Sequence, residues 1–565
     1  MSENQIRSLF DELLENELTQ HAHKIGTGKK SIQYLGEIVE HAYKYNPIQG
    51  ENMRQALDIL IPTMYKVPIT TDNTSIDEPD VQAIMDACIF AGHYRQTRDL
   101  IYLSFKSPSA VQWELSESII KIKTKDISFF RQLACETQSF LLNSRNVFPP
   151  ENRNIESLIA QVDYWDNSDL KTQEIVRLLE QEAEIKIQHF FSYIPSDSTV
   201  DIGGFTYHDF LNVYKSTLIV SLYERRWAKL HDEPSVITYQ EDALIEMHAS
   251  NANISKTTCA KILKELSEAS RGTFNYIKES KEYLLFPFSY SVIDQIAEIL
   301  KLFAKKNEGG FSAGCATIIG NSLVKKVSSY FLKYPNFRVL TDVNLQKFDK
   351  KLPDMDVVAF SYEPTFGFQF YICEVKNNLP ASWIKEHLKL SDHKGALQKA
   401  KSQILNLQEF IQTPECLSLL KGMIHDQFKG LDFDKYFPTG FMATINFLVV
   451  TNQNIGVLLN DNDLKIVNND ILRHLINSSD GDTIYIKYHL DNLNYLIDQS
   501  YKLISDTFSL GKYQIVYDIS SLEKTIAFPP NQYLSKNMLE RLEQDGISED
   551  YRFIDWFMDK MGNQK

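Results

Sequence analysis

The sequence contains no apolar run long enough to cross a membrane. Its apolar runs are short pieces such as "FLVV" at 447–450, whereas a membrane-spanning helix needs about 20 apolar residues. The first residues, "MSENQIRSLFDELLENEL", are acidic and space Ile6, Leu9, Phe10 and Leu13 at helical intervals, which is unlike a signal peptide. We therefore expect a soluble, cytoplasmic protein with no membrane partner.

Cysteine is scarce, and its spacing excludes two classes of site. The six cysteines are scattered, with no pair in a CxxC pattern, so neither a disulfide framework nor a thiolate zinc site is encoded. His21 and His23 likewise lack partner ligands at metal spacing. We expect reduced, buried thiols at the six positions, which are Cys88, Cys135, Cys259, Cys315, Cys373 and Cys416.

A phosphate-binding loop for nucleotides is also missing. The stretch "GTGKKS" at 26–31 has His23 where the Walker A pattern needs its first glycine, and Lys30 where it needs serine or threonine. The stretch is typical of an exposed loop, so a motor ATPase is unsupported.

Positive charge is in short supply over the whole chain, whose formal net charge is −15. Nucleic-acid binding depends on Lys and Arg that neutralise phosphates, so this balance argues against a polyanionic ligand. The segment 321–403 is an exception, because it has 13 Lys and Arg against 8 Asp and Glu. A solvated surface would explain such a cluster equally well. The residue pattern within the segment therefore has to distinguish a nucleic-acid-binding surface from a solvated one.

Apolar periodicity, by contrast, is sufficient for several cores. From residue 1 to about 300 the spacing is mostly helical, as in "VQAIMDACIFAGHY". A length of 565 residues suggests about three or four domains. We expect an α+β multidomain protein whose large N-terminal region is all-α. The expected units are helical domains at 1–150 and 151–305, an α/β domain at 306–480, and a mixed C-terminal segment at 481–565.

The pattern changes between about 310 and 455. An amphipathic helix is followed by three predicted strands, "FRVLTDVNL", "DMDVVAFS" and "FQFYICEVKN", of which the last two are joined by the turn "YEPTFG". "INFLVVTN" then predicts a fourth strand. A helix precedes it, with a core side formed by Leu397, Ala400, Ile404, Leu407 and Ile411.

Charged residues interrupt two of these apolar strands. Because side chains alternate between the faces of a strand, Asp354 and Asp356 share one face of the second strand. Glu374 and Lys376 share one face of the third, and neighbouring antiparallel strands can bring the two faces together. Carboxylates that converge beside a lysine form a hard, oxygen-rich site suited to Mg²⁺ or Mn²⁺. Such an ion activates water and neutralises phosphate, which is the chemistry of phosphodiester hydrolysis.

"PDMDVVAF" followed by "CEVKNN" resembles the PD-(D/E)xK, or restriction-endonuclease-like, nuclease superfamily. The order of elements from about 310 to 455 is similar to the αβββαβ core of that superfamily, and this segment is about a quarter of the chain. The resemblance implies that Asp356 and Glu374 are metal ligands and that Lys376 is the catalytic lysine. Asp354 follows the proline literally, but Asp356 is the better match to the strand aspartate of Holliday-junction-resolvase-like members.

Two positions depart from the superfamily pattern. Many relatives carry an acidic residue on the first helix, where "GNSLVKKVSSYF" has Val324, so a second metal site is in doubt. Many also use a glutamine on the helix after the motif, where Gln398 and Gln403 lie about 140° apart around the helix axis. Gln398 shares its flank with Lys394 and Lys401, which suits a nucleic-acid backbone, whereas the resemblance favours Gln403. Both glutamines stay open.

A weaker motif lies at 253–270, "NISKTTCAKILKELSEAS". It resembles the recognition-helix half of a winged helix, with Ser255 as the N-cap and Ile262 and Leu266 facing inward. An ordinary capped helix explains the same residues, and we favour that interpretation.

The sequence therefore predicts a metal-dependent nuclease, and DNA is the expected substrate. RNA stays open because the chemistry does not distinguish the sugars. The architecture is similar to that of bacterial restriction and antiphage-defence endonucleases. The helical N-terminal region is expected to recognise a substrate, a protein partner or a second copy, or to restrain activity. The alternative is a non-catalytic nucleic-acid-binding or scaffold protein with a degenerate nuclease-like domain, which Val324 favours.

Overall fold

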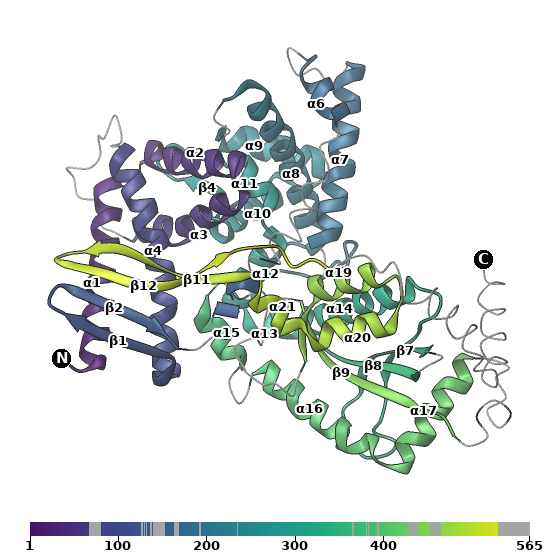
Figure 1. Cartoon of the computed structure of the whole chain (residues 1–565). Helices are drawn as coiled ribbons and strands as arrows, with labels where there is room; N and C mark the ends of the chain where they lie inside the picture. Colours follow the sequence, from purple (N-terminus) through teal and green to yellow (C-terminus); the bar gives the residue numbers. More distant parts are fainter. Residues whose placement is uncertain are drawn as a thin grey trace.

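The computed structural model describes residues 1–26, 28–66, 81–125, 153–162, 169–190, 194–233, 236–363, 366–379, 383–391, 395–428, 440–452 and 465–528, with a few single residues between these ranges. It is a mixed α+β structure in which helices predominate (Figure 1). All six cysteines are free and buried, as the sequence predicts. No helix within the described ranges combines the length and the apolar character needed to span a bilayer.

The N-terminal part consists of helices that end in a β-hairpin. Its elements are α1 (Glu3–Ile25), α2 (Lys29–Tyr45), α3 (Pro47–Met64), α4 (Val81–Lys106), the 3-10 helix η2 (Pro108–Ala110), β1 (Val111–Ser116) and β2 (Ile119–Thr124). Apolar residues on one side of each helix pack into a common core with the inner face of the hairpin, which carries Trp113 and Ile122.

The next part is also mainly helical. It comprises α6 (Arg153–Ile159), α7 (Leu170–Phe190), α8 (Tyr207–His231), β3 (Ile237–Gln240), α9 (Glu241–Ala252), α10 (Lys256–Ala269), β4 (Phe274–Ile277), β5 (Glu282–Leu285), α11 (Pro287–Val292), α12 (Gln295–Lys306) and α13 (Glu308–Gly314). The expectation of an all-α N-terminal region is therefore wrong. In "VQWELS" and "IIKIKT" buried and exposed residues alternate, a strand pattern too short to stand out among long helices.

The five-stranded sheet occupies the centre of the remaining chain. Its elements are α14 (Ala316–Leu332), β6 (Arg338–Val343), β7 (Met355–Glu363), β8 (Gly367–Lys376), α15 (Ile384–Ser391), α16 (Ala396–Ile411), α17 (Pro414–Gln427), β9 (Ala443–Thr451) and β10 (Ile466–Asn468). The strand order is β10-β9-β8-β7-β6. The pairs β6–β7 and β7–β8 are antiparallel, and the pairs β8–β9 and β9–β10 are parallel. The predicted order of helix, three strands, helix and strand is present. The insertion before the fourth strand contains α17 and is helical, as the sequence indicates, whereas α15 is an additional helix.

Helices cover both faces of this sheet (Figure 1). Val357, Cys373 and Val375 pack on one face with α14 and with α19 (Asn469–Ser479) and α20 (Thr483–Asp491). Val358 and Ile372 pack on the other face with α16 and α17. The alternation of side chains along β7 and β8 therefore assigns each residue to one of two separate cores.

The C-terminal part links the sheet to the N-terminal helices. After α21 (Leu493–Asp498), strands β11 (Tyr501–Leu510) and β12 (Tyr513–Leu522) form a long hairpin that reaches the hairpin of β1 and β2 (Figure 1). Together they make a four-stranded sheet in the order β1-β2-β12-β11, in which β2 and β12 are parallel.

Candidate active site on the five-stranded sheet

The two central strands of the five-stranded sheet bring Asp356 and Glu374 together. In the antiparallel pairing of β7 and β8, Val357 lies opposite Cys373. One residue before Val357 and one after Cys373, Asp356 therefore lies opposite Glu374. A hydrogen bond supports this register, because the Val375 amide donates to Asp356 Oδ2 at 2.7 Å.

Both carboxylates face α16 rather than α14. Asp356 has the same orientation as Val358, and Glu374 the same as Ile372, and both of these apolar residues pack with α16. Cys373 lies on the opposite face. The expected convergence of the carboxylate face of β7 with that of β8 is therefore present.

Lys376 and Gln403 complete the group. The Lys376 ammonium forms an ion pair with Glu374 Oε1 and donates a hydrogen bond to Gln403 Oε1 at 3.1 Å. Gln403 is thus the glutamine of α16 that reaches the lysine. Gln398 and Lys401 also lie on α16, and their part in nucleic-acid binding stays a prediction. Lys394 lies outside the described residues.

Burial makes the charge on this site costly. Glu374 is only 2% exposed, and burial, reinforced by the neighbouring Asp356, raises its pKa to about 7 although Lys376 opposes the shift. Burial likewise raises the pKa of Asp356, opposed by the Val375 amide and Lys376. Carboxylates held in this way bind protons, or another cation, more readily than exposed ones.

Asp354 lies two residues before Asp356 in the chain. It precedes β7, and its charge contributes to raising the pKa of Asp356. Asp354 Oδ1 and Glu374 Oε2 are both buried without a hydrogen-bond partner among the described residues. A buried carboxylate oxygen without a partner is unfavourable, and a bound cation would supply one.

The donor set suits magnesium only if water and substrate complete the coordination. Within the described ranges, no three His, Cys, Asp or Glu side chains lie close enough to hold a metal ion by themselves. Mg²⁺ is commonly held by one or two carboxylates, with water and phosphate oxygens as the remaining ligands. Asp356 and Glu374 fit that requirement.

The sequence reasoning missed one acidic neighbour. Thr341 and Val343 of β6 pair with Val357 and Met355 of β7, which places Asp342 opposite Asp356. Asp342 has a left-handed backbone, with φ 52°, and its charge helps to raise the pKa of Asp356. The aspartate within the predicted strand "FRVLTDVNL" was the available signal.

Val324 explains the missing acidic residue of the first helix. It is 7% exposed and packs in the core between α14 and the sheet, on the face that carries Cys373. A carboxylate at this position would be buried among apolar side chains. The first helix therefore contributes an apolar residue where many relatives have an acid.

Comparison with known proteins gives no match: neither a protein-family model, nor a curated protein, nor a solved structure is significantly similar to this chain.

Proposed function

We propose that the chain is a metal-dependent nuclease that hydrolyses phosphodiester bonds, with DNA as its substrate. The observation that carries the proposal is the group formed by Asp356, Glu374 and Lys376, in which two carboxylates and an ammonium share one end of one sheet face. These groups suit the hydrolysis of a phosphodiester, because the reaction needs an oriented nucleophile and stabilisation of the developing negative charge.

Each residue of the group has a distinct role in the proposal. Asp356 and Glu374 would hold Mg²⁺ or Mn²⁺, and water and phosphate oxygens would complete the coordination. The expected third ligand, Asp354, does not form a group of three with them. The ion would lower the pKa of a bound water and neutralise a phosphate oxygen. Lys376 donates hydrogen bonds that orient the nucleophile and stabilise the developing charge. Gln403 is a positioning residue, since its amide oxygen accepts a hydrogen bond from the Lys376 ammonium at 3.1 Å.

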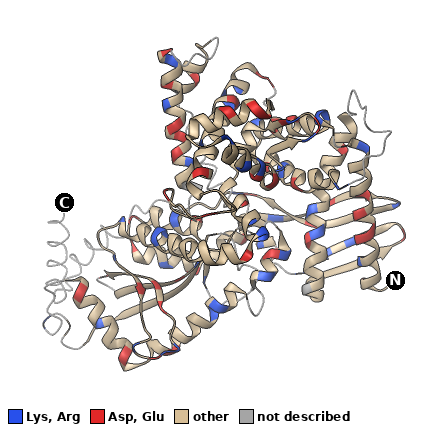
Figure 2. Cartoon of the chain, turned by 180° about the vertical axis from the view of Figure 1, so that it is seen from behind, with Lys and Arg blue, Asp and Glu red and all other residues tan. Residues whose placement is uncertain are grey.

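The distribution of charge supports a nucleic-acid substrate at this site. Acidic residues, red in Figure 2, lie along α1 and α7 in the helical part of the chain. Such helices repel phosphate, whereas the segment 321–403 carries an excess of Lys and Arg. This arrangement would restrict non-specific binding, as expected of a bacterial restriction or antiphage-defence endonuclease.

Cleavage assays with single variants test the proposal. The purified chain is incubated with single- and double-stranded DNA and RNA, with and without Mg²⁺, beside Asp356→Ala, Glu374→Ala and Lys376→Ala. We expect magnesium-dependent cleavage by the natural chain and none by the three variants. Equal cleavage by all four proteins would eliminate the assignment. Cleavage of RNA alone would correct the substrate.

The second candidate is a nucleic-acid-binding or scaffold protein without catalytic activity. Val324 favours it, because no carboxylate comes from α14 at that position. Calorimetry with Mg²⁺ and Mn²⁺ distinguishes the two candidates. A nuclease should bind metal at pH 8 and bind it more weakly at pH 6, because Glu374, with a pKa of about 7, must then lose a proton first. Absence of metal binding at both pH values would favour the second candidate.

A further inference from the structure

A small unit outside the sheet of the candidate active site has the topology of a winged helix. Along the chain it runs α8, β3, α9, α10, β4 and β5, and its three strands pair in the order β3-β5-β4, all antiparallel. Two helices joined by a short turn, followed by a hairpin whose second strand pairs with the strand before the helices, are a means of presenting one helix to a DNA groove.

The turn between the two helices is well defined. Asn253 ends α9 with a left-handed backbone, with φ 53°, and Ser255 Oγ accepts a hydrogen bond from the Thr258 amide at 3.0 Å to begin α10. The inner side of α10 carries Cys259 and Ile262, which are completely buried. The N-cap and the inward residues are those that the sequence indicates, but the surrounding strands make α10 more than an isolated capped helix.

Polar contacts attach the C-terminal end of α10 to the rest of the molecule. Lys306 of α12 forms ion pairs with Glu265 at 2.6 Å and Glu268 at 2.7 Å. Just beyond the helix, Gln295 contacts Ser270 and donates to Thr273 at 3.0 Å.

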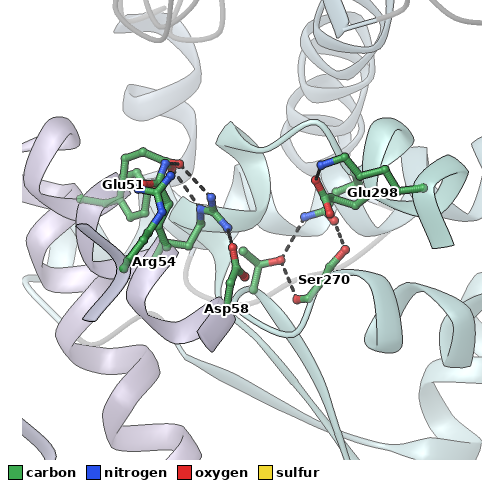
Figure 3. Close-up of polar contacts among 11 residues, drawn as sticks. Glu51, Arg54, Asp58, Ser270 and Glu298 are labelled. Atoms are coloured by element: carbon green, nitrogen blue, oxygen red, sulfur yellow. Dashed lines mark hydrogen bonds and ion pairs between the residues drawn. The ribbon is translucent and has the colours of Figure 1, made fainter. Parts of the chain in front are cut away.

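The α3 helix approaches the same corner (Figure 3). Arg54 pairs with Glu51 at 2.8 Å and Asp58 at 2.6 Å. A Cβ at Gly272 would lie 2.5 Å from Asp58 Oδ1, so the chain passes directly against this carboxylate. The end of α10 is therefore packed within the protein on two sides.

The outer side of α10 is polar and basic. Lys256, Thr257, Lys261 and Lys264 are exposed. The two acidic residues of the helix, Glu265 and Glu268, are paired with Lys306.

Acidic groups from neighbouring elements also lie beside this surface. Glu246 forms an ion pair with Lys256 at 3.0 Å, with both side chains mostly exposed. Hydrogen bonds from the Gly203 and Gly204 amides lower the pKa of Asp201, and the charge of the nearby Lys261 adds to this effect. Exposed pairs of this kind contribute little to stability, so a phosphate can replace the carboxylate at small cost.

We propose that the outer side of α10, defined by Lys256, Thr257, Lys261 and Lys264, binds the major groove of double-stranded DNA. The major groove of B-form DNA is wide enough for an α-helix. Lysines neutralise phosphates, and the hydroxyl of Thr257, in the first turn, can bond to base edges or phosphates. This binding does not depend on the proposed nuclease activity, because no residue of the candidate active site takes part.

Duplex DNA is favoured over duplex RNA by the shape of the surface. The major groove of A-form RNA is deep and narrow, and side chains from a helix cannot reach its base edges. A fluorescence-anisotropy titration with a labelled DNA duplex and a labelled RNA duplex of the same sequence compares the affinities of the chain for the two nucleic acids. The full chain in EDTA should bind the DNA duplex at least about tenfold more tightly. Equal binding of both duplexes would contradict docking in the major groove.

Charge reversal of the surface gives the decisive comparison. Lys256→Glu, Lys261→Glu and Lys264→Glu are combined in one chain, and we expect its affinity for the DNA duplex to fall by at least about tenfold. The slope of log K against log salt should become shallower by about 0.9 for each phosphate contact that is lost. A milder variant, Lys261→Ala with Lys264→Ala, should show a smaller loss in the same direction and covers the case in which the triple variant fails to fold.

The matched control reverses three exposed lysines elsewhere, Lys121→Glu, Lys171→Glu and Lys512→Glu. It changes the net charge by the same amount, so a general effect of charge would weaken binding equally in both chains. Equal weakening, or none in either, overturns the proposal even if the chain cleaves DNA. Selective weakening supports it even if no cleavage occurs, so the two proposals fail separately.

Discussion

Glu374 combines deep burial with two charged neighbours, and the balance between these effects determines its protonation. Burial and Asp356 favour the protonated carboxyl, while Lys376 favours the carboxylate. The pKa of about 7 shows that burial and Asp356 together exceed the effect of the lysine. A carboxyl group in this state destabilises the folded chain when it loses its proton without gaining a cation.

Glu374→Gln should therefore stabilise the metal-free protein at high pH. The pKa of Glu374 is about 7 in the folded chain and about 4.3 in the unfolded chain. The natural chain therefore loses free energy of unfolding as the pH rises from about 4.3 to about 7, and does not regain it at higher pH. At pH 8 we expect the variant to be more stable by about 1 to 3 kcal/mol, and at pH 4 equally stable. Urea unfolding in EDTA at the two pH values measures the difference.

An exposed glutamate provides the control for that experiment. Glu415→Gln changes the same functional group at a solvated position on α17, so its stability should follow the natural chain at both pH values. A Glu374→Gln chain that is less stable at pH 8 would show that the ion pair with Lys376 outweighs burial.

Gln403 and Gln398 form a matched pair on α16. Of the two, Gln403 accepts the hydrogen bond from Lys376, so Gln403→Ala should lower the proposed nuclease activity by about 10- to 100-fold, whereas Gln398→Ala should not produce this loss. Because the lysine loses a partner that orients it, the pH profile of the Gln403→Ala protein should also shift. Identical profiles for both variants would leave Gln403 without a positioning role.

At the scale of elements, α16 decides which face of the sheet can form a site. Its apolar side packs on β7 and β8 around Ile404, which is 1% exposed, while the adjacent Leu405 is 48% exposed. The helix thereby closes the core next to Glu374 and holds Gln403 above it. The sequence predicts this apolar side correctly at Leu397, Ala400, Ile404 and Leu407, which are buried. The fifth predicted residue, Ile411, is only partly buried against the same core.

The two adjacent residues give a direct test of that packing. Ile404→Ala should destabilise the protein by about 2 to 5 kcal/mol, because it removes buried methyl groups and leaves a cavity. Leu405→Ala should change stability by less than about 0.5 kcal/mol. Chemical unfolding of the two variants measures both values. Similar losses of stability would show that α16 does not pack on the sheet through Ile404 in preference to Leu405.

At the scale of the whole molecule, the four-stranded sheet joins segments that lie far apart in sequence. Ile120 of β2 pairs with Ile515 of β12, and Ile515 and Tyr517 are buried with residues of the N-terminal helices. The expected boundaries at 150, 305 and 480 stay predictions. The hairpin of β11 and β12, which lies within the expected C-terminal segment, packs into the N-terminal core.

Hydrogen exchange should reveal this connection. Ile515→Ala removes buried contacts shared by both hairpins, so we expect faster amide exchange in 111–124 as well as in 501–522. Ile504 of β11 is 39% exposed, and Ile504→Ala should leave exchange in 111–124 unchanged. Mass spectrometry of peptides from both segments measures the rates. Acceleration confined to 501–522 would show that the two hairpins open independently.

The sequence by itself determined the order of elements between α14 and β9 and the orientation of their side chains. Periods of two and 3.6 residues are local properties, so the shared face of Glu374 and Lys376 and the apolar side of α16 could be read directly. Asp354 precedes β7, and its shared face with Asp356 stays a prediction. The short strands of the N-terminal half escaped notice, because few residues carry their alternation.

Only the tertiary structure selected Gln403 over Gln398, brought Asp342 beside Asp356, and built strands around α10. It also joined the first and last hairpins into one sheet. Each of these results depends on which segments pack together across long stretches of chain. That choice is made by the free energy of the whole folded core, which no local pattern of residues contains.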